Sequence, residues 1–262
     1  MANSHGDYIW YELITTNADA AQEFYGPLLG WEFKDSGTPG MDYRLVSKNG
    51  VEIAGLMTLT QDMLDGGARP MWAGYISVRE IEAGVAKLKE LGGSVFMGPN
   101  YLEGVGHMAF VADPQGAPFY LMQPEGPEGQ ESQSFARHEP REGHCAWNEL
   151  VTADQPGAHS FYTALFGWEK ADSMDMGEMG LYDIYSVGDY TLGAFMQKPA
   201  EMPASLWSYY FRVPDIDAAI AYTGENGGQV LMGPQEIPGG EFVMQGLDPH
   251  GAMFSLIGKK GS

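Results

Sequence analysis

The chain has 262 residues, of which 44% are hydrophobic and 12% aromatic, which is enough apolar material for packed cores and excludes a disordered chain. Its 35 acidic residues against 14 basic ones give a formal charge of −21, which repels phosphate backbones and anionic lipid and argues against nucleic-acid and membrane partners. The one cysteine, Cys145, excludes an intrachain disulfide, and without a signal-peptide pattern or an apolar run of about 18 residues we expect a soluble cytoplasmic protein.

The first half of the chain begins with a predicted strand and helix. The strand covers residues 8–15, and Asn17 offers an N-cap for a helix that ends at Gly30, where a left-handed residue is expected. Segments at 41–47 and 51–57 mix aliphatic, aromatic and polar residues over strand-like lengths, so further strands follow the helix.

A second strand–helix unit follows in the same half. It has a predicted strand over 72–78, a helix over 81–91 and the pair Gly92-Gly93 that closes this helix. Three more strands come next, and Asp-Pro-Gln-Gly at 113–116 predicts the last hairpin turn. Each half of the chain is therefore predicted to be strand–helix–three strands, twice, in the α+β class.

The second half repeats the first with the same motifs in the same order. The segment from Trp10 aligns with the one from Trp147, and the segment from Trp72 aligns with the one from Trp207, with nearly half of the aligned residues identical. We interpret the chain as a duplication. The predicted parts are a first domain over 5–124, a Pro-, Gly-, Ser- and Glu-rich linker over 125–142, and a second domain over 143–260.

These motifs together resemble the vicinal oxygen chelate superfamily, which holds glyoxalases, bleomycin-resistance proteins and extradiol dioxygenases. The resemblance rests on F-Y-x-x-L-x-G-W at the end of the first helix (Phe24 to Trp31, Phe161 to Trp168), on the Gly-Gly helix stops, and on D-P-x-G-x-x-F in the last hairpin. It implies two tandem domains, each a pair of βαβββ modules whose curved sheet forms a cup.

Catalytic members of that family hold a divalent metal in the cup through four side chains on four strands. The corresponding positions here are Trp10, Ala73, Tyr120 and one near Gly55 in the first domain, and Trp147, Ser208, Ser255 and one near Gly193 in the second. None of these side chains offers an imidazole or a carboxylate to a divalent cation. We therefore expect no metal site and predict no cofactor.

Both halves keep the pattern W-x-E-L in the first strand. Alternation puts Trp10 with Glu12, and Trp147 with Glu149, on one face, which by resemblance is turned into the cup. A carboxylate in an apolar pocket is a candidate catalytic base, or an anchor for a hydroxyl, amine or cation of a ligand. The alternative is a structural Glu that accepts backbone or Tyr hydrogen bonds, and the sequence leaves both open.

The hypothesis is a glyoxalase- or bleomycin-resistance-like protein that binds a small, partly aromatic or amphipathic molecule without the family metal, as a monomer or homodimer. The residues expected to bind this ligand are Trp10, His107, Tyr120, Trp147, Ser208 and Ser255. Whether the molecule is transformed stays open. One alternative is a metal-dependent glyoxalase-like lyase or dioxygenase with a non-standard site. Another is that one domain is a degenerate copy that serves mainly as a structural partner for the other.

Overall fold

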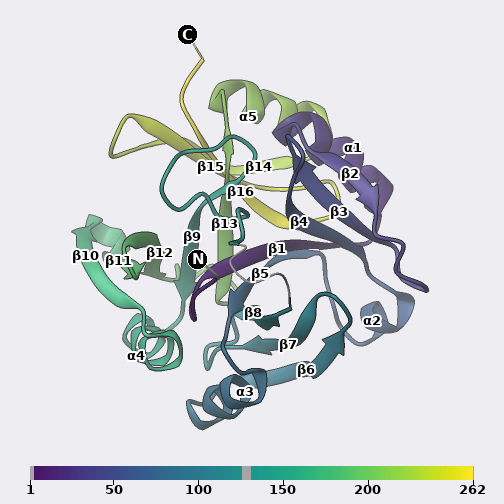
Figure 1. The fold of residues 1–262 in the computed structure, drawn as a ribbon. Helices are drawn as coiled ribbons and strands as arrows, with labels where there is room; N and C mark the ends of the chain where they lie inside the picture. The colour runs from purple at the N-terminus through teal and green to yellow at the C-terminus, as the bar shows by residue number, and fades with distance from the viewer. Residues whose placement is uncertain (1–2, 126–130, 262) are drawn as a thin grey trace. The chain divides into compact units, whose positions relative to one another are not determined.

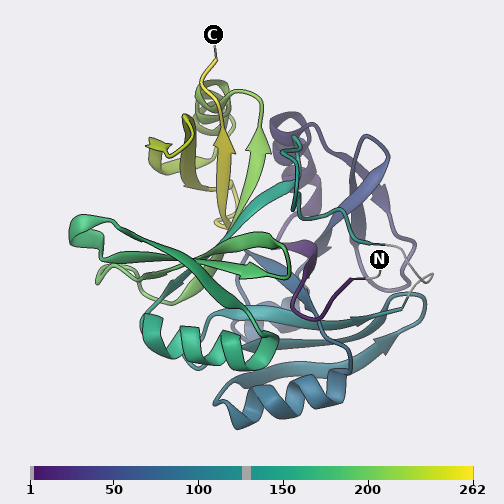
Figure 2. The ribbon, with the colours of Figure 1, turned by 60° about the vertical axis from the view of Figure 1, so that its left-hand side comes forward.

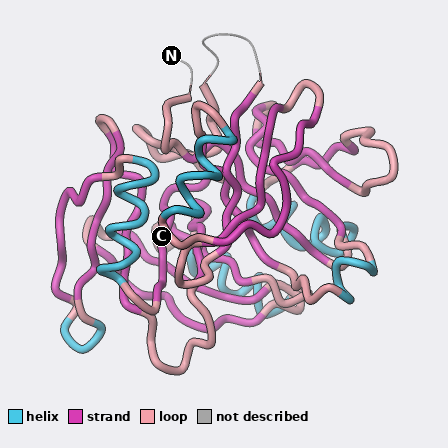
Figure 3. The backbone as a smooth tube through the Cα atoms, turned by 90° about the horizontal axis from the view of Figure 1, so that it is seen from below, coloured by secondary structure: helices cyan, strands magenta, loops and turns pink. Residues whose placement is uncertain are grey.

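The computed structural model describes residues 3–125 and 131–261, so residues 126–130 of the predicted linker lie outside the described residues. Strands make up more of the chain than helices do, and the helices are separate segments between the strands (Figure 3). Four times in chain order, a strand is followed by a helix and three further strands (Figure 1). We call each such segment a module, and the observed order of elements confirms the predicted one.

Modules 1 and 2 belong to the first repeat. Module 1 consists of β1 (Tyr8–Thr15), α1 (Ala18–Leu29), β2 (Glu32–Asp35), β3 (Tyr43–Lys48) and β4 (Val51–Thr58). Module 2 consists of β5 (Met71–Ser77), α3 (Ile81–Glu90), β6 (Ser94–Leu102), β7 (Gly106–Ala112) and β8 (Pro118–Pro124). Between them lies a short helix that the sequence did not predict, α2 (Gln61–Asp65).

Modules 3 and 4 belong to the second repeat. Module 3 consists of β9 (Cys145–Thr152), α4 (Gln155–Phe166), β10 (Glu169–Asp175), the 3-10 helix η1 (Gly177–Met179), β11 (Leu181–Val187) and β12 (Tyr190–Gln197). Module 4 consists of β13 (Leu206–Val213), α5 (Ile216–Glu225), β14 (Gln229–Ile237), β15 (Glu241–Leu247) and β16 (Met253–Gly258).

The first helix of each repeat begins and ends where the sequence predicts. The Asn17 side chain accepts a hydrogen bond from the Ala20 backbone N–H at 3.1 Å, which satisfies one of the free donors at the start of α1. Gly30 closes α1 with φ 63°, and Gly167 closes α4 with φ 73°, a left-handed conformation that favours glycine.

The strands form two eight-stranded sheets, one for each repeat. Their strand orders are β2-β3-β4-β1-β5-β8-β7-β6 and β10-β11-β12-β9-β13-β16-β15-β14. Each sheet therefore contains two modules in mirrored order, which confirms the predicted α+β class. Among the described residues, no helix is long and apolar enough to cross a membrane.

The chain packs into two compact units, and each unit takes modules from both repeats. Unit 1 contains most of modules 2 and 3, in the segments Met1–Ile9, Gly74–Ser132 and Trp147–Trp207. Unit 2 contains most of modules 1 and 4, in the segments Trp10–Ala73, Gln133–Ala146 and Ser208–Ser262. The packing thus groups the modules differently from the sequence, and the domain boundaries at 124 and 143 stay a prediction.

In unit 2, a buried tyrosine and a buried aspartate join the two modules. Tyr25 of α1 donates its hydroxyl to Asp248 at 3.2 Å and accepts a hydrogen bond from the Trp72 indole at 3.2 Å. The other oxygen of Asp248 accepts from the backbone N–H groups of His250 and Ala252. Burial raises the pKa of Asp248, although these hydrogen bonds and the nearby His250 oppose the rise.

Unit 1 repeats this arrangement with the corresponding residues. Tyr162 of α4 donates to Asp113 at 3.1 Å and accepts from the Trp207 indole at 3.0 Å, while Asp113 also accepts from the backbone of Gln115 and Ala117. Burial likewise raises the pKa of Asp113 against these hydrogen bonds. Much of the motif set that carries the family resemblance is therefore structural, because it joins a helix of one repeat to a turn of the other.

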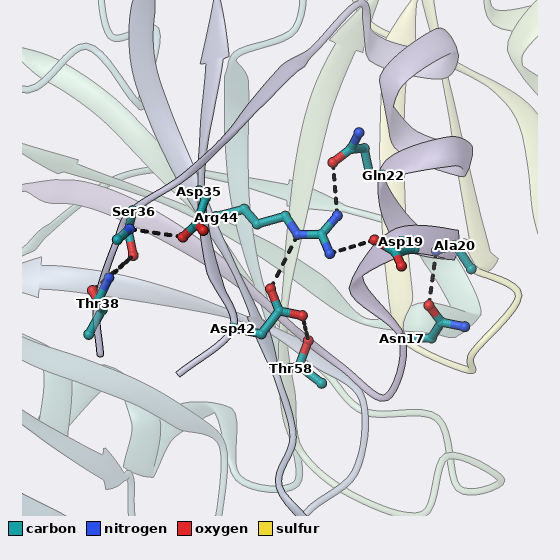
Figure 4. A network of polar contacts seen from close by, with 11 residues as sticks. Asn17, Asp19, Ala20, Gln22, Asp35, Ser36, Thr38, Asp42, Arg44 and Thr58 are labelled. Carbon is teal, nitrogen blue, oxygen red and sulfur yellow. Dashed lines mark hydrogen bonds and ion pairs between the residues drawn. The ribbon is translucent and has the colours of Figure 1, made fainter. Parts of the chain in front are cut away.

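In each repeat, a charged side chain of the third strand links the first helix to its module. This side chain is positive in the first repeat and negative in the second. In module 1, Arg44 of β3 donates to Asp19 of α1 at 2.6 Å, to Gln22 at 2.9 Å and to Asp42 at 3.3 Å (Figure 4). Asp183 takes the place of Arg44 in module 3 and accepts from Gln155 of α4, at 3.0 Å. The link to the helix is kept while the sign of the charge is exchanged.

Module 2 has one face covered by its helix and one face turned away from it. Helix α3 packs against β6, β7 and β8 (Figure 2). Gln123 of β8 accepts a hydrogen bond from the Ile81 backbone N–H at the start of α3, so Gln123 marks the helix-covered face. Alternation then places Tyr120 on the opposite face, which we call the open face of a module.

Candidate functional site

In module 3, β9 presents Trp147 and Glu149 on the same face, as alternation predicts. Trp147 is half-buried and Glu149 is 6% exposed. A carboxylate at this depth is costly unless it accepts hydrogen bonds, so its partners decide what it can do.

Tyr182 of β11 connects the tryptophan to the carboxylate. Its hydroxyl donates to Glu149 Oε2 at 2.8 Å and accepts from Trp147 Nε1 at 2.8 Å. An indole N–H can only donate, so both bonds have a fixed direction, from Trp147 to Tyr182 to Glu149. This series of hydrogen bonds ends on the acceptor oxygens of Glu149, which suit a ligand group that donates hydrogen bonds.

In module 1, the same residue types meet in a different arrangement. Glu12 is 2% exposed, and the half-buried Trp10 donates its indole N–H to the Tyr43 hydroxyl at 3.2 Å. Gly55 of β4 pairs with Glu12, and a methyl group added to Gly55 would lie 1.9 Å from the Tyr43 hydroxyl oxygen. The Tyr43 hydroxyl therefore lies in space that only a glycine leaves open.

The open face of module 2 carries a row of aromatic rings across four neighbouring strands. Tyr75 stacks on Tyr120 with ring centroids 4.1 Å apart and planes 9° from parallel. Phe110 follows at 4.7 Å from Tyr120, and Phe96 at 5.5 Å from Phe110. Tyr75 and Tyr120 are buried, Phe110 is half-buried and Phe96 is 61% exposed, so the row runs from the interior to the surface.

The open face of module 4 is polar at the corresponding positions. Ser208 and Ser255 are buried, with their hydroxyl oxygens 2.6 Å apart. Gln245 of β15 donates its amide to the Tyr210 hydroxyl at 2.8 Å. The structure therefore brings the two predicted serines together, in a cluster with two residues that the sequence analysis did not single out.

His107, which the sequence analysis expected beside the ligand, is not brought together with Tyr120. It pairs across β7 and β8 with Gln123, the residue that marks the helix-covered face, and its ring packs 4.8 Å from that of Tyr101. The pleat of β7 turns His107 away from the face that carries Phe110, and we leave it out of the site.

The strand register corrects one of the positions that the family uses for metal binding. Glu149 pairs with Ala194, as Glu12 pairs with Gly55, so Ala194 rather than Gly193 is the counterpart of Gly55. The sequence placed this position only near Gly193, to within a residue or two, because the loop lengths of the two repeats differ.

The residues at the family's metal positions do not fit a divalent cation. They offer indole, phenol, hydroxyl and alkyl groups, whereas such cations take imidazole, thiolate or carboxylate ligands. Within the described ranges, no three His, Cys, Asp or Glu side chains come together as a metal site would require.

Sequence reasoning missed Tyr43 and Tyr182, although a signal for them was present. Both belong to the third strand of their module, in MDYRLVS and LYDIYSV, and each lies on the strand next to the small residue that faces the Glu. A repeated Tyr opposite a repeated Trp-x-Glu would have indicated a polar link between the strands.

Comparisons with known proteins match the chain to one family twice. The model of the Glyoxalase/Bleomycin resistance protein/Dioxygenase superfamily matches residues 8–121 and 142–256. "Putative glyoxylase CFP32" of Mycobacterium bovis is 34% identical over 95% of this chain and 93% of its own length. "Anthracycline biosynthesis protein DauV" of Streptomyces sp. (strain C5) is 30% identical over 95% of this chain and 91% of its own length.

Solved structures share the fold at low sequence identity. 2,2',3-Trihydroxybiphenyl 1,2-dioxygenase from Sphingomonas wittichii has a TM-score of 0.67 and 14% identity, covering 97% of this chain and 91% of its own. The Mn(II)-bound glyoxalase from Novosphingobium aromaticivorans has a TM-score of 0.65 and 16% identity, covering 99% and 84%.

Proposed function

Because the chain belongs to the glyoxalase/bleomycin resistance protein/dioxygenase superfamily, we propose that it binds a planar aromatic small molecule and does so without a divalent metal. In this proposal the ligand contacts the open face of module 2, where Tyr120 occupies one of the family's metal positions. The observation that carries this proposal is the aromatic row on the open face of module 2.

Tyr120 stands at the centre of that row and at the position of the last metal ligand in family enzymes. Its ring is in stacking contact with Tyr75 on one side and close to Phe110 on the other. Rings arranged in this way favour a flat aromatic partner, which gains both apolar burial and favourable ring–ring geometry. Phe96 and Phe110 leave part of the row accessible from the surface.

Two groups of side chains, which we call the Trp–Tyr–Glu sets, supply polar anchors for a ligand, each within its own unit: Trp10, Tyr43 and Glu12 in module 1, and Trp147, Tyr182 and Glu149 in module 3. Glu149 and Glu12 accept hydrogen bonds, so they suit a hydroxyl or an amine on the ligand rather than a carboxylate or phosphate. The formal charge of −21 has the same effect, since it repels anionic ligands. A carboxylate in reach of a ligand hydroxyl is also the group that could take its proton, which gives Glu12 and Glu149 their proposed catalytic role.

Two relatives support an aromatic ligand by their names. "Anthracycline biosynthesis protein DauV" and "Anthracycline biosynthesis protein DnrV" each match this chain at 30% identity over 95% of its length. Anthracyclines contain a planar fused-ring system, the kind of surface that a row of stacked rings accommodates.

Binding is tested by titrating 1-naphthol and 1,4-dihydroxyanthraquinone into the protein, with cyclohexanol as the non-aromatic control. We expect saturable binding of both aromatic compounds, weaker binding in Phe110→Ala, and no change in Phe242→Ala, which removes a half-buried ring of β15 that alternation from Gln245 places on the other face of module 4. Equal response to cyclohexanol, or equal affinity in Phe110→Ala, would contradict the proposal.

The role of the two glutamates is tested by Glu12→Gln and Glu149→Gln. This change keeps the shape and removes the charge, so an anchor loses ligand affinity while the fold keeps its stability. If both changes destabilise the fold and leave 1-naphthol binding unaltered, the two glutamates have a structural role only.

The metal-dependent lyase or dioxygenase is tested separately, by metal analysis of protein purified without chelators. One Fe, Mn, Ni or Zn per chain would favour it.

A further inference from the structure

The two Trp–Tyr–Glu sets differ at one position of the fourth strand, Gly55 in β4 and Ala194 in β12. The register makes these residues equivalent, since each pairs with the Glu of its module on one side. On the other side Gly55 pairs with Leu45 and Ala194 with Ile184, each two residues along β3 or β11 from the tyrosine. Such diagonal neighbours are close enough in a sheet for a large side chain to reach across.

The space above Gly55 holds the Tyr43 hydroxyl. A methyl group there would lie 1.9 Å from that oxygen and 3.1 Å from Trp10 Nε1. Both are the far ends of side chains, so an alanine at this position would displace the hydroxyl by a rotation of the tyrosine about its Cα–Cβ bond and would leave the backbone in place. In module 3 that methyl group exists, as the fully buried side chain of Ala194.

The Tyr182 hydroxyl therefore cannot occupy the place that the Tyr43 hydroxyl takes. It lies instead 2.8 Å from Glu149 Oε2, with the Trp147 indole donating to it from the other side at 2.8 Å. Tyr182 is half-buried, so part of this residue is accessible from the surface. The two phenols thus differ in position, and the two repeats differ beside them by one methyl group.

We infer that Ala194 is a positioning residue that holds the Tyr182 hydroxyl on Glu149, and that this pair forms a subsite in the second repeat for a hydroxyl or ammonium group. Both oxygens accept hydrogen bonds from such a group, and the carboxylate also attracts a cation. The subsite rests on the proposed function, whereas the role of Ala194 in positioning the Tyr182 hydroxyl does not.

The position of the phenol is tested without any ligand. In protein labelled with 3-fluorotyrosine, the fluorine NMR signals of Tyr182 and Tyr43 are assigned by their loss in Tyr182→Phe and Tyr43→Phe. We expect Glu149→Gln to shift the Tyr182 signal in the otherwise unchanged chain, and to shift it by less than half as much when Ala194→Gly is also present. Ala194→Ser, which keeps a β-carbon, restores the full response.

The reciprocal change Gly55→Ala supplies the matched experiment in the first repeat. It moves the Tyr43 hydroxyl out of the space above residue 55, so the Tyr43 signal shifts while the Tyr182 signal stays in place. An unchanged Tyr43 signal in Gly55→Ala, or an unchanged response of Tyr182 in Ala194→Gly, would overturn the assignment of this role.

The ligand arm compares 1-naphthol with 1-methylnaphthalene, which lacks the hydroxyl. We expect Ala194→Gly to weaken 1-naphthol binding by about fivefold, the loss of roughly one well-placed hydrogen bond, and to leave 1-methylnaphthalene binding unchanged. An equal effect on both compounds would refute the subsite. If neither compound binds the unchanged protein, the proposed function fails, and the NMR experiment still decides the role of Ala194.

Discussion

Modules 2 and 4 take the same place in the two repeats, yet the open face of module 2 is aromatic and that of module 4 is polar. Where module 2 has Tyr120 and Phe110, module 4 has Ser255 and Gln245. The first modules of the two repeats, by contrast, both keep a tryptophan and a glutamate on the first strand and a tyrosine on the third. The two repeats thus keep these three residue types and differ in the open face that we propose as the ligand surface.

A change from aromatic to polar requires several substitutions at once. A single buried hydroxyl needs a hydrogen-bond partner, and module 4 supplies one for each polar group: Ser208 with Ser255, and Gln245 with Tyr210. On the open face of module 2, aromatic rings pack against one another instead. Each face is therefore consistent within itself, and mixing the two should destabilise the fold.

Tyr120→Ser tests this with the largest expected effect. It removes a buried ring from between two others and leaves a hydroxyl in apolar surroundings, so we expect a loss of about 3 kcal/mol in the free energy of unfolding. Ser255→Ala at the corresponding position removes one hydrogen bond and should cost about 1 kcal/mol. Urea denaturation measures both, and equal losses would remove the distinction between the faces.

The two buried aspartates should behave alike, because they belong to the part of the repeat that did not diverge. Asp113→Ala and Asp248→Ala each remove the acceptor for a tyrosine hydroxyl and for two backbone N–H groups. We expect each to cost about 2 kcal/mol. Denaturation curves that differ by more than the error between the two variants would show that the repeats diverged here too.

The same pair predicts a pH dependence. The folded state raises the pKa of both carboxyls above their usual 3.8, so it binds their protons more tightly than the unfolded state does. The stability that this contributes is present at low pH and is lost as pH rises through the raised pKa values. In Asp113→Asn with Asp248→Asn, thermal unfolding measured across this range should show a smaller decline with rising pH; an unchanged decline would assign it to other groups.

Chelation should have the smallest effect. Since neither repeat offers a divalent cation a fitting set of ligands, we expect treatment with EDTA to leave the melting temperature unchanged. Addition of Zn²⁺, Mn²⁺ or Ni²⁺ afterwards serves as the control. If EDTA lowers the melting temperature markedly and one of these ions restores it, the conclusion that neither repeat binds a divalent cation is contradicted.

The sequence by itself determined the repeat, the order strand–helix–three strands and the limits of the first helices. These follow from local signals: Asn17 caps a helix, Gly30 ends it, and alternation along β1 places Trp10 and Glu12 on one face. The family and the α+β class followed from the same motifs, because their order is preserved in both halves.

Only the tertiary structure decided which strands and modules lie together. The grouping of Tyr162 with Asp113, the turn of His107 to the helix-covered face and the equivalence of Gly55 with Ala194 all depend on strand register and on packing between segments far apart in sequence. A shift of one residue in register sends a side chain to the other face of a sheet, and no local pattern fixes that shift where loops differ in length. The position of the Tyr182 hydroxyl is decided in the same way, since it depends on a methyl group in the neighbouring strand.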